Sequence, residues 1–350
     1  FRKVRQNLLD QHLTVIEGLG IPSDQQRILA GTVEEEFHEL ERLFRSISIM
    51  GELTRRGLDA VKSIGPILST HILSTLLQHQ GVRARPINTT DILILDTTSG
   101  KPVPSIDDTR KLAVQHLLPA LNEGFLPVCT ASIGSTLKGA PAMLDQGGGD
   151  TSAAALAAAL QADECWIWTD VDGILTADPT FTSEAVTIQE LSYDQAEDLA
   201  RFGADVIHPA TLLPGNDLEF TLRIRSSFNP DHPGTLISRQ SCLRSHQPPA
   251  ILSLTGLSMI AIQDNEYNWS LSTATRILDS LHYSGVDVLM FHQPMSTPGL
   301  LLILRDRDCD YAIQCLKHGR GQKVPGTLTF DISPGIALIT IVSLHVEEHG

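Results

Sequence analysis

The stretch LDQGGGDTSAAALAAAL, residues 144–160, decides the fold because it joins a glycine turn to a strongly helical run. The three glycines at 147–149 have no Cβ and can adopt a positive φ, so their backbone can approach a ligand closely. Asp150, Thr151 and Ser152 are typical helix N-cap residues, and the Ala/Leu run behind them has high helix propensity. Free N–H groups at such a helix start suit a phosphate. Three glycines alone are equally compatible with an ordinary loop-to-helix junction.

The strand and helix patterns around this stretch alternate. We expect strands at 125–130, 164–169 and 205–207, with helices at 150–160 and 193–202 between them. Strands separated by helices of this length indicate an α/β fold with a mostly parallel sheet and helices on both faces.

The N-terminal part is predicted to be helical. Residues 1–44 show helical spacing of apolar residues, with a break at 21–24 that a Ser or Asp would cap. A further helix runs from Leu58, and the segment 63–66 is expected to interrupt it or to start its successor, because it contains Gly65 and Pro66.

The C-terminal part follows a different order. Residues 239–249 have the composition of a linker. Beyond them, 250–317 reads as strand, helix, two strands and helix, which is the order of a small split βαβ domain. One more strand is predicted from Ile336 to His345. A terminal strand without a following helix suggests truncation or completion by a partner element.

Composition limits the classes of function. A chain of 350 residues is long enough for two or three domains, and its hydrophobic content of 42% fits large cores. A formal net charge of −15 argues against nucleic acid and anionic membrane surfaces as partners. We find no signal peptide and no apolar run long enough to span a bilayer. The five cysteines are scattered without metal-ligand spacing, so we expect a cytoplasmic, reducing environment and no zinc site.

A second polar cluster follows the strand at 164–169. The chain continues there as Asp170-Val171-Asp172-Gly173. Carboxylates and a glycine at the carboxyl end of a strand are typical of open α/β sheets, whose ligands bind beyond that edge. Asp170 and Asp172 are also common turn residues, so they could serve a purely structural turn.

Taken together, these motifs resemble the aspartate kinases of the amino acid kinase family, most closely the single-function fungal type, over nearly the whole chain. The residues that carry the resemblance are Asp163-Glu164, Trp168 to Ile174, Ala177-Asp178-Pro179, Phe202-Gly203-Ala204, His208-Pro209, Phe228-Asn229-Pro230 and Pro233-Gly234-Thr235. The resemblance implies an amino acid kinase domain over 1–238 that lacks its first strand, and the linker at 239–249. It implies a ferredoxin-like ACT regulatory domain over 250–350, with the first strand of a second ACT domain.

The resemblance also implies a reaction, the transfer of the γ-phosphoryl group of ATP to the β-carboxylate of L-aspartate, with ATP and Mg²⁺ as cofactors. Such a transfer needs in-line positioning and N–H dipoles or cations near the moving group. The implied catalytic residues are Asp150, Gly148 and Gly149. The implied nucleotide-binding residues are Thr169, Asp170, Asp172, Gly173, Ala177, Asp178 and Pro179. The implied substrate-binding residues are Ser63, Gly65, Gln146 and Gly147. No metal-ligating residue is assigned, and His208 is interpreted as a packed residue beside a Pro turn.

The departures from the family pattern concern mainly the amino-acid substrate. The family opens with a strand and a Lys-Phe-Gly-Gly-Thr loop that is absent here, so we expect the chain to begin inside a longer gene product. Pro66 stands where the family has a Glu for the substrate ammonium group, and Gln146 where it has an Arg for the substrate carboxylate. Gln lacks the charged fork, so aspartate affinity should fall. The segment 130–134 and Thr180 also depart from the pattern.

Three hypotheses therefore stay open: an aspartate kinase, a diverged paralogue that phosphorylates another carboxylate, and a non-catalytic member that binds nucleotide or a partner. ACT domains pair through sheet edges, so we expect a homodimer or higher homo-oligomer. By resemblance, an allosteric amino acid would bind near Gln263, Asp264 and Asn265, although a solvated turn is the commoner reason for polar residues in a surface loop.

Overall fold

The computed structural model describes residues 2–98, 100–144, 147–202, 206–216, 220–239, 249–264, 269–294, 298–318 and 328–342. The chain forms two compact units. Unit 1 comprises Phe1–Leu175 and Thr187–Gln247, and unit 2 comprises Thr176–Val186 and Pro248–Gly350. Most of the predicted linker lies outside the described residues. The division into domains 1–238 and 250–350 stays a prediction, and the segment 176–186 packs with unit 2.

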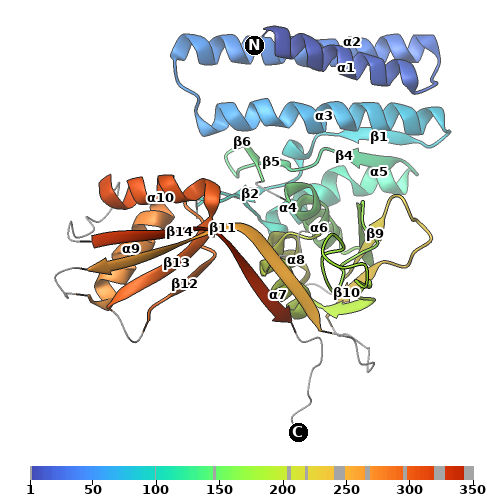
Figure 1. Cartoon of the computed structure of the whole chain (residues 1–350). Helices are drawn as coiled ribbons and strands as arrows, with labels where there is room; N and C mark the ends of the chain where they lie inside the picture. The colour runs from blue at the N-terminus through green and yellow to red at the C-terminus, as the bar shows by residue number, and fades with distance from the viewer. Residues whose placement is uncertain are drawn as a thin grey trace. The chain divides into compact units, whose positions relative to one another are not determined.

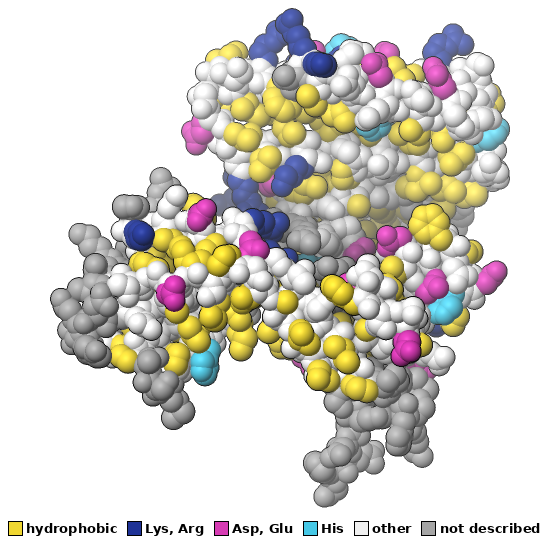
Figure 2. Space-filling view, viewed as in Figure 1, with side chains coloured by type: hydrophobic (Ala, Val, Ile, Leu, Met, Phe, Trp, Pro, Cys, Tyr) yellow, Lys and Arg dark blue, Asp and Glu magenta, His cyan; other side chains and the backbone are white. Residues whose placement is uncertain are grey.

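Three long helices form an N-terminal layer of unit 1 (Figure 1). They are α1 (Arg2–Gly18), α2 (Ser23–Met50) and α3 (Arg55–His79). Buried side chains such as Ile16, Phe37 and Leu68 form their common core. Hydrophobic side chains are also exposed over this layer (Figure 2). The predicted helix and its break are confirmed. The predicted Ser or Asp cap of α2 is wrong, because Pro22 is the N-cap and no side chain caps this helix.

The helix α3 runs through Pro66 without interruption, so the predicted break at 63–66 is wrong. A proline removes one backbone hydrogen bond and crowds the preceding turn, at a cost of about 3 kcal/mol. Ile64 and Leu68, on either side of Pro66, are buried in the core of the layer. We attribute the continuity of α3 to this packing, which offsets the local cost. By length and composition alone, α3 is the one described helix that could cross a membrane, whereas no such run is predicted from the sequence; 22% of its most apolar window is buried in this structure.

Below α3, two short strands pair in parallel and small hairpins connect them to the helices that follow (Figure 1). The strands of this part are β1 (Ala84–Ile87), β2 (Leu95–Asp96), β3 (Val103–Pro104), β4 (Leu126–Cys129), β5 (Ile133–Ser135) and β6 (Pro141–Met143). The helices are the short η1 (Thr89–Asp91), α4 (Ile106–His116) and α5 (Leu118–Asn122). Strands β1 and β4 are parallel, while β2–β3 and β5–β6 are antiparallel hairpins.

The glycine turn leads into α6 (Gly148–Leu160), which is followed by a four-stranded sheet in the order β7-β9-β10-β8. The strands are β7 (Glu164–Thr169), β8 (Glu190–Ser192), β9 (Thr221–Ser226) and β10 (Thr235–Ser238). Two pairs, β7–β9 and β10–β8, are parallel, and β9–β10 is antiparallel. The α/β fold class is confirmed, and the described strands form separate sheets within it.

Two further helices of unit 1 are α7 (Tyr193–Arg201) and α8 (Pro209–Asn216). Helix α7 begins with a capping box between Ser192 and Gln195, as expected for the predicted helix at 193–202. The predicted strand at 205–207 is wrong at its described positions, because Val206 and Ile207 form a turn that leads into α8. Residue 205 lies outside the described residues.

Unit 2 is built on an antiparallel sheet in the order β12-β13-β11-β14 with two helices. Its elements are β11 (Ala250–Asp264), α9 (Leu271–Tyr283), β12 (Met290–His292), β13 (Gly299–Arg305), α10 (Asp306–His318) and β14 (Leu328–Val342). Buried side chains from both helices and from one face of the sheet form one core, as Ile260, Ile277 and Ala312 illustrate. The predicted order of strands and helices is confirmed.

The last strand differs from the prediction. Instead of a separate strand from Ile336, β14 begins at Leu328 and pairs with β11 along almost its whole length. The register shifts near Leu254–Met259, and both Gly256 on β11 and Gly335 on β14 have positive φ. A bulge of this kind bends a strand without ending it. The terminal strand is therefore paired within the chain.

Candidate active site

The glycine turn that leads into α6 adopts a backbone that only glycine tolerates well. Gly147, the N-cap of α6, has φ +72°, in the left-handed region. A Cβ at this position would lie 2.4 Å from the Cβ of His208. At Gly148 it would lie 2.8 Å from the Cβ of Leu144, whereas at Gly149 the nearest atom would be 3.9 Å away. The turn is thus closely packed at its first two glycines and has free space at the third.

His208 packs against this turn, a position that the sequence did not predict. It precedes α8, and its Nδ1 accepts a hydrogen bond from the N–H of Ala210 at 3.2 Å. The hydroxyl groups of Thr151 on α6 and Thr211 on α8 lie 3.3 Å apart. The starts of α6 and α8 therefore meet, and His208 lies where they meet. The only sequence signal was the His-Pro pair that opens α8.

Asp150 lies in the first turn of α6 and is partly buried. Burial raises the pKa of its carboxyl group, and the nearby His208 acts in the opposite direction. A carboxylate in such a position can orient cationic or N–H groups around a ligand.

The N-terminus of α6 carries no side-chain cap. Thr151 and Ser152 were expected as cap residues, but the helix begins earlier, at Gly148. Their hydroxyls instead donate to the carbonyls of Gly147 and Gly149, at 3.0 and 2.8 Å. The N–H groups of the first turn are consequently left to a ligand or to solvent, as an anion site requires.

The second polar cluster forms a turn at the carboxyl end of β7. Thr169 donates its hydroxyl to Asp170 at 3.1 Å, and its carbonyl accepts from the N–H of Ser227 at 2.8 Å. Asp172 accepts from the side-chain amide of Asn229 at 3.2 Å. The turn after β7 is thus tied to the loop at 227–234.

Gly173 is required by the geometry of this turn. Its φ is +117°, and a Cβ there would lie 2.6 Å from the hydroxyl oxygen of Thr235. That buried hydroxyl accepts from the N–H of Ile174 at 2.9 Å and donates to the carbonyl of Ile188 at 2.7 Å. The β10 strand therefore fixes the end of the turn through one side chain.

The two polar clusters belong to consecutive elements of the chain. A connection of three residues, 161–163, joins α6 to β7, and the two elements pack together. Burial raises the pKa of the Cys165 thiol on β7, and the charge of Asp150 in the first turn of α6 acts in the same direction, so this turn lies near β7. The carboxyl end of such a strand is the edge at which open α/β sheets bind their ligands.

The remaining predicted site residues are less closely connected to this edge. Ser63 and Gly65 lie within α3, where the Ser63 hydroxyl donates to the carbonyl of Ala60 at 2.8 Å. Ala177, Asp178 and Pro179 belong to unit 2. Two hydrogen bonds from Thr180 lower the pKa of the Asp178 carboxyl group.

Three predicted positions have no described side chain. Gln146 and Asn265 lie outside the described residues, and of Asp264 only the backbone is described. Gln263 is exposed on β11, where its carbonyl accepts from the Thr329 hydroxyl at 3.4 Å. The predicted roles of these residues stay predictions.

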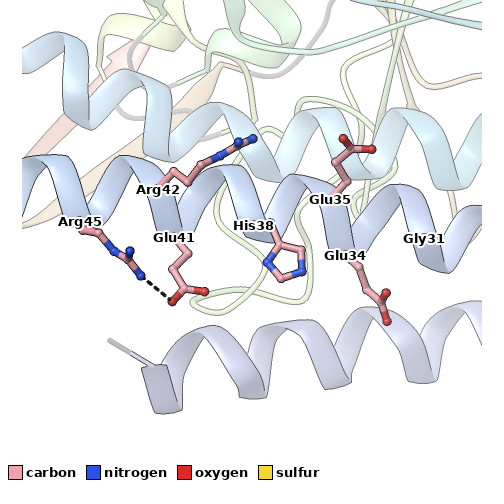
Figure 3. A pocket seen from close by; sticks show the side chains of 7 residues that line it. All are labelled: Gly31, Glu34, Glu35, His38, Glu41, Arg42 and Arg45. Atoms are coloured by element: carbon pink, nitrogen blue, oxygen red, sulfur yellow. Dashed lines mark ion pairs between the residues drawn. The ribbon is translucent and has the colours of Figure 1, made fainter.

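A pocket of about 480 Å³ on α2 does not have the chemistry of a phosphate site. It is lined by Gly31, Glu34, Glu35, His38, Glu41, Arg42 and Arg45. The carboxylates outnumber the arginines, and Arg45 pairs with Glu41 at 3.9 Å (Figure 3). Glu34 and His38 lie on one side of α2, and Glu35 and Arg42 on the other (Figure 3). The pocket contains none of the predicted site residues.

Comparison with known proteins identifies the family of the chain. Residues 7–226 match the model of the amino acid kinase family. The chain is 36% identical to lysine-sensitive aspartokinase 3 of Escherichia coli over 221 residues, which cover 62% of this chain and 48% of that protein. It is 29% identical to chloroplastic aspartokinase 1 of Arabidopsis thaliana over 281 residues, or 79% of this chain and 49% of that protein.

Among solved structures, the fold is similar to that of E. coli aspartokinase III in complex with aspartate and ADP, with a TM-score of 0.79 and 25% identity. The alignment covers 96% of this chain and 73% of that one. The chain spans about half the length, or less, of the curated relatives named above.

Proposed function

The chain belongs to the amino acid kinase family, and we propose that it transfers the γ-phosphoryl group of ATP to the β-carboxylate of L-aspartate, giving 4-phospho-L-aspartate. The observation that carries the proposal is the start of α6, which has no side-chain cap and has Asp150 in its first turn. The relatives are aspartokinases, and one of the similar structures contains aspartate and ADP.

The nucleotide is assigned to the edge formed by α6 and β7. The N–H groups at the start of α6 would suit the phosphates, because no side chain caps this helix. The space around Gly149 allows a phosphate oxygen to approach the backbone. Thr169, Asp170 and Asp172 would hold the nucleoside side of ATP beyond the end of β7.

Mg²⁺ is part of the proposal, and the residues present fit an ion that arrives with the nucleotide. The described residues contain no group of three or more His, Cys, Asp or Glu that could hold a metal ion. Mg²⁺ in kinase sites is bound by one or two carboxylates together with substrate phosphates. Bound Mg²⁺ would offset charge on the phosphates, and Asp150 is the carboxylate placed closest to them in the proposal.

The protein's own contribution to the reaction is positioning. Phosphoryl transfer needs little covalent chemistry from a kinase and depends on alignment and on charge stabilisation. The first turn of α6 would hold the moving phosphoryl group with its N–H dipoles. Asp150 would orient the groups around it, and the packing of His208 on Gly147 would keep the turn in place.

A second candidate function has an observation in its favour. Pro66 stands where the family has a Glu for the substrate ammonium group, and it is accommodated within a continuous α3. With Gln146 in place of the family's Arg, the amino-acid side of the site has lost two charges. A paralogue whose substrate lacks both the α-amino group and the carboxylate that the family's Arg would hold would explain both changes. A non-catalytic nucleotide-binding member is the third possibility that the experiment below separates.

Unit 2 supports a regulatory and assembly role for residues 250–350. Its β-α-β-β-α-β order is that of a ferredoxin-like ACT domain, which we propose binds an amino acid near Gln263–Asn265. We also propose a homodimer through this unit. The start of β11 (250–254) and the end of β14 (338–342) pair to form what we call the terminal ribbon. Its side chains Ile251, Ile339 and Ile341 are 50, 68 and 69% exposed, and an exposed apolar surface favours association. The four described cysteines are free, in keeping with the proposed cytoplasmic, reducing environment.

Calorimetry with MgATP and with L-aspartate in separate titrations, followed by a phosphoryl-transfer assay, tests the function. We expect ATP to bind more tightly than aspartate, because the nucleotide motif is intact. Transfer to aspartate supports the kinase. Transfer only to another carboxylate supports the paralogue, and ATP binding without transfer supports the non-catalytic member. Tight aspartate binding without ATP binding would contradict the assignment of an intact nucleotide side and a changed amino-acid side to this site.

A further inference from the structure

Two tryptophans stand side by side on the outer face of β7, with an arginine of β9 stacked on both. Trp166 and Trp168 are 44 and 47% exposed, and their ring centroids are 5.9 Å apart. The guanidinium carbon of Arg225 lies 4.7 Å from the Trp166 ring centroid and 5.4 Å from that of Trp168. The parallel register of the strands explains the stack, because Trp168 is paired with Arg225.

The same guanidinium group holds the loop that follows β9. Its Nη2 donates to the carbonyl of Pro230 and, at 3.3 Å, to the carbonyl of His232. Its Nε is buried without a hydrogen-bond partner. In the part of the chain that the structure describes, no carboxylate pairs with Arg225. The positive charge of Arg225 thus contacts aromatic rings and backbone carbonyls of the loop.

The loop in turn holds the turn after β7. The N–H of Ser227 donates to the carbonyl of Thr169 at 2.8 Å, and the amide of Asn229 donates to Asp172 at 3.2 Å. Thr169 and Asp172 are the residues to which the proposed function assigns the nucleotide. A continuous chain of contacts therefore runs from the Trp pair through Arg225 and the loop to the nucleotide residues.

We propose that Arg225, stacked on Trp166 and Trp168, is a positioning residue that fixes the loop at 227–234 and thereby sets the affinity for the nucleotide. The inference rests on the proposed function for the identity of the ligand. Arg225 acts through the backbone of the loop and does not itself need to touch ATP. A guanidinium group can donate hydrogen bonds to two carbonyls while its plane stacks on an aromatic ring. The ammonium group of Lys has no such plane, so Lys cannot fully replace Arg225.

The test uses the full chain with Trp269→Phe, so that fluorescence comes only from Trp166 and Trp168. In this background we compare Arg225→Met, Arg225→Lys and the control Arg83→Met. Arg83 has matching chemistry at the amino end of β1. It stacks on Phe125 at 4.1 Å and donates to the carbonyl of Glu123 at 2.7 Å. The readouts are hydrogen exchange of residues 227–234, Trp emission, the thermal midpoint, and the dissociation constant of MgATP by calorimetry.

We expect Arg225→Met to speed hydrogen exchange of the loop and to weaken ATP binding, each about tenfold, since hydrogen bonds from a charged group are lost. The emission of the Trp pair should change and the midpoint should stay close to that of the parent. Arg225→Lys should retain most of the emission but bind ATP nearly as weakly as Arg225→Met. Arg83→Met should match the parent in every readout.

Unchanged loop exchange in both Arg225 variants would overturn the inference, whatever ATP does. Faster exchange with an unchanged ATP dissociation constant would also overturn it while leaving the proposed function standing. A parent chain that binds no ATP would overturn the proposed function and the inference together. If Arg225→Met fails to fold, Arg225→Lys decides the question alone, because it keeps a cation over the two rings.

Discussion

The Cβ of His208 lies 2.4 Å from the place that a Cβ on Gly147 would occupy. We therefore expect Gly147→Ala to be strongly destabilising, through both this clash and the positive φ of +72°. Gly149→Ala is the matched control, because its nearest atom would be 3.9 Å away and Ala favours a helix by about 1 kcal/mol over Gly. Thermal unfolding of both variants checks this. Equal stabilities would contradict the packing of His208 on the turn.

Gly149→Ala also tests the site, because its fold should be intact or stabilised while the new methyl group faces the proposed phosphate. We expect ATP affinity to fall although the thermal midpoint does not. Calorimetry beside thermal unfolding separates the two effects. A variant that binds ATP as well as the parent would move the phosphate away from this turn.

The raised pKa of Asp150 has a consequence for stability. The folded chain binds this proton more tightly than the unfolded chain does, so the group costs stability as pH rises from its ordinary pKa of 3.8 through the raised folded value. Asp150→Asn should therefore raise the thermal midpoint at neutral pH and abolish phosphoryl transfer. The advantage should disappear toward about pH 3.

Asp178→Asn is the control for Asp150→Asn, because the expected change in stability has the opposite sign. Hydrogen bonds from Thr180 lower the pKa of Asp178, so its ionised form contributes stability above its ordinary pKa. The loss at neutral pH should be small because this carboxylate is exposed. An Asp150→Asn protein less stable than the parent at neutral pH would mean that the carboxylate is favourably paired in the folded state.

Thr235 is expected to be the most sensitive polar residue of the turn after β7. Thr235→Val keeps the shape but leaves the buried N–H of Ile174 and the carbonyl of Ile188 without their partner. We expect a loss of about 2–4 kcal/mol in the free energy of unfolding, measured by urea denaturation. The control is Thr275→Val. The hydroxyl of Thr275 is exposed and donates only to the carbonyl of Leu271 in its own helix, so its loss should be nearly neutral for stability. Similar losses in both variants would contradict the role of Thr235.

Position 66 separates stability from substrate binding. Pro66→Ala should stabilise the chain by up to about 3 kcal/mol, because it restores a backbone hydrogen bond inside α3. Pro66→Glu with Gln146→Arg should add to this a gain in aspartate affinity of about tenfold, equivalent to about 1.4 kcal/mol, if the chain is a drifted aspartate kinase. Titration with aspartate distinguishes the two. No gain over Pro66→Ala, with transfer to another carboxylate in the parent, would favour the paralogue.

The exposed isoleucines of the terminal ribbon predict how copies associate. Ile339→Glu with Ile341→Glu should convert the proposed dimer to a monomer in light scattering, because two charges would enter an apolar interface. Ile28→Glu, at a residue 71% exposed on α2, is the control and should leave the mass unchanged. A parent chain that is already monomeric would remove the homodimer from the proposal. A double variant that stays dimeric would place the interface elsewhere.

The sequence by itself determined the secondary structure at places where local signals are not opposed by contacts with distant residues. The run behind Gly149 folds as the predicted helix, and β7 spans the predicted 164–169. Local propensity, capping and the alternation of apolar residues are sufficient at these places, because no competing contact reverses them. The α/β class and the order of elements in unit 2 follow from the same signals.

Only the tertiary structure decided the features that depend on contacts between distant residues. Burial of Ile64 and Leu68 keeps α3 straight through Pro66, against local propensity. Pairing with β11 makes one strand of residues 328–342, which a pattern read along the chain divides at Gly335. His208 reaches the glycine turn, and Arg225 the Trp pair, because the packing of α8 and the register of β9 bring together residues more than fifty positions apart. Such contacts leave no periodic trace in a single sequence, since each depends on where two elements meet in space.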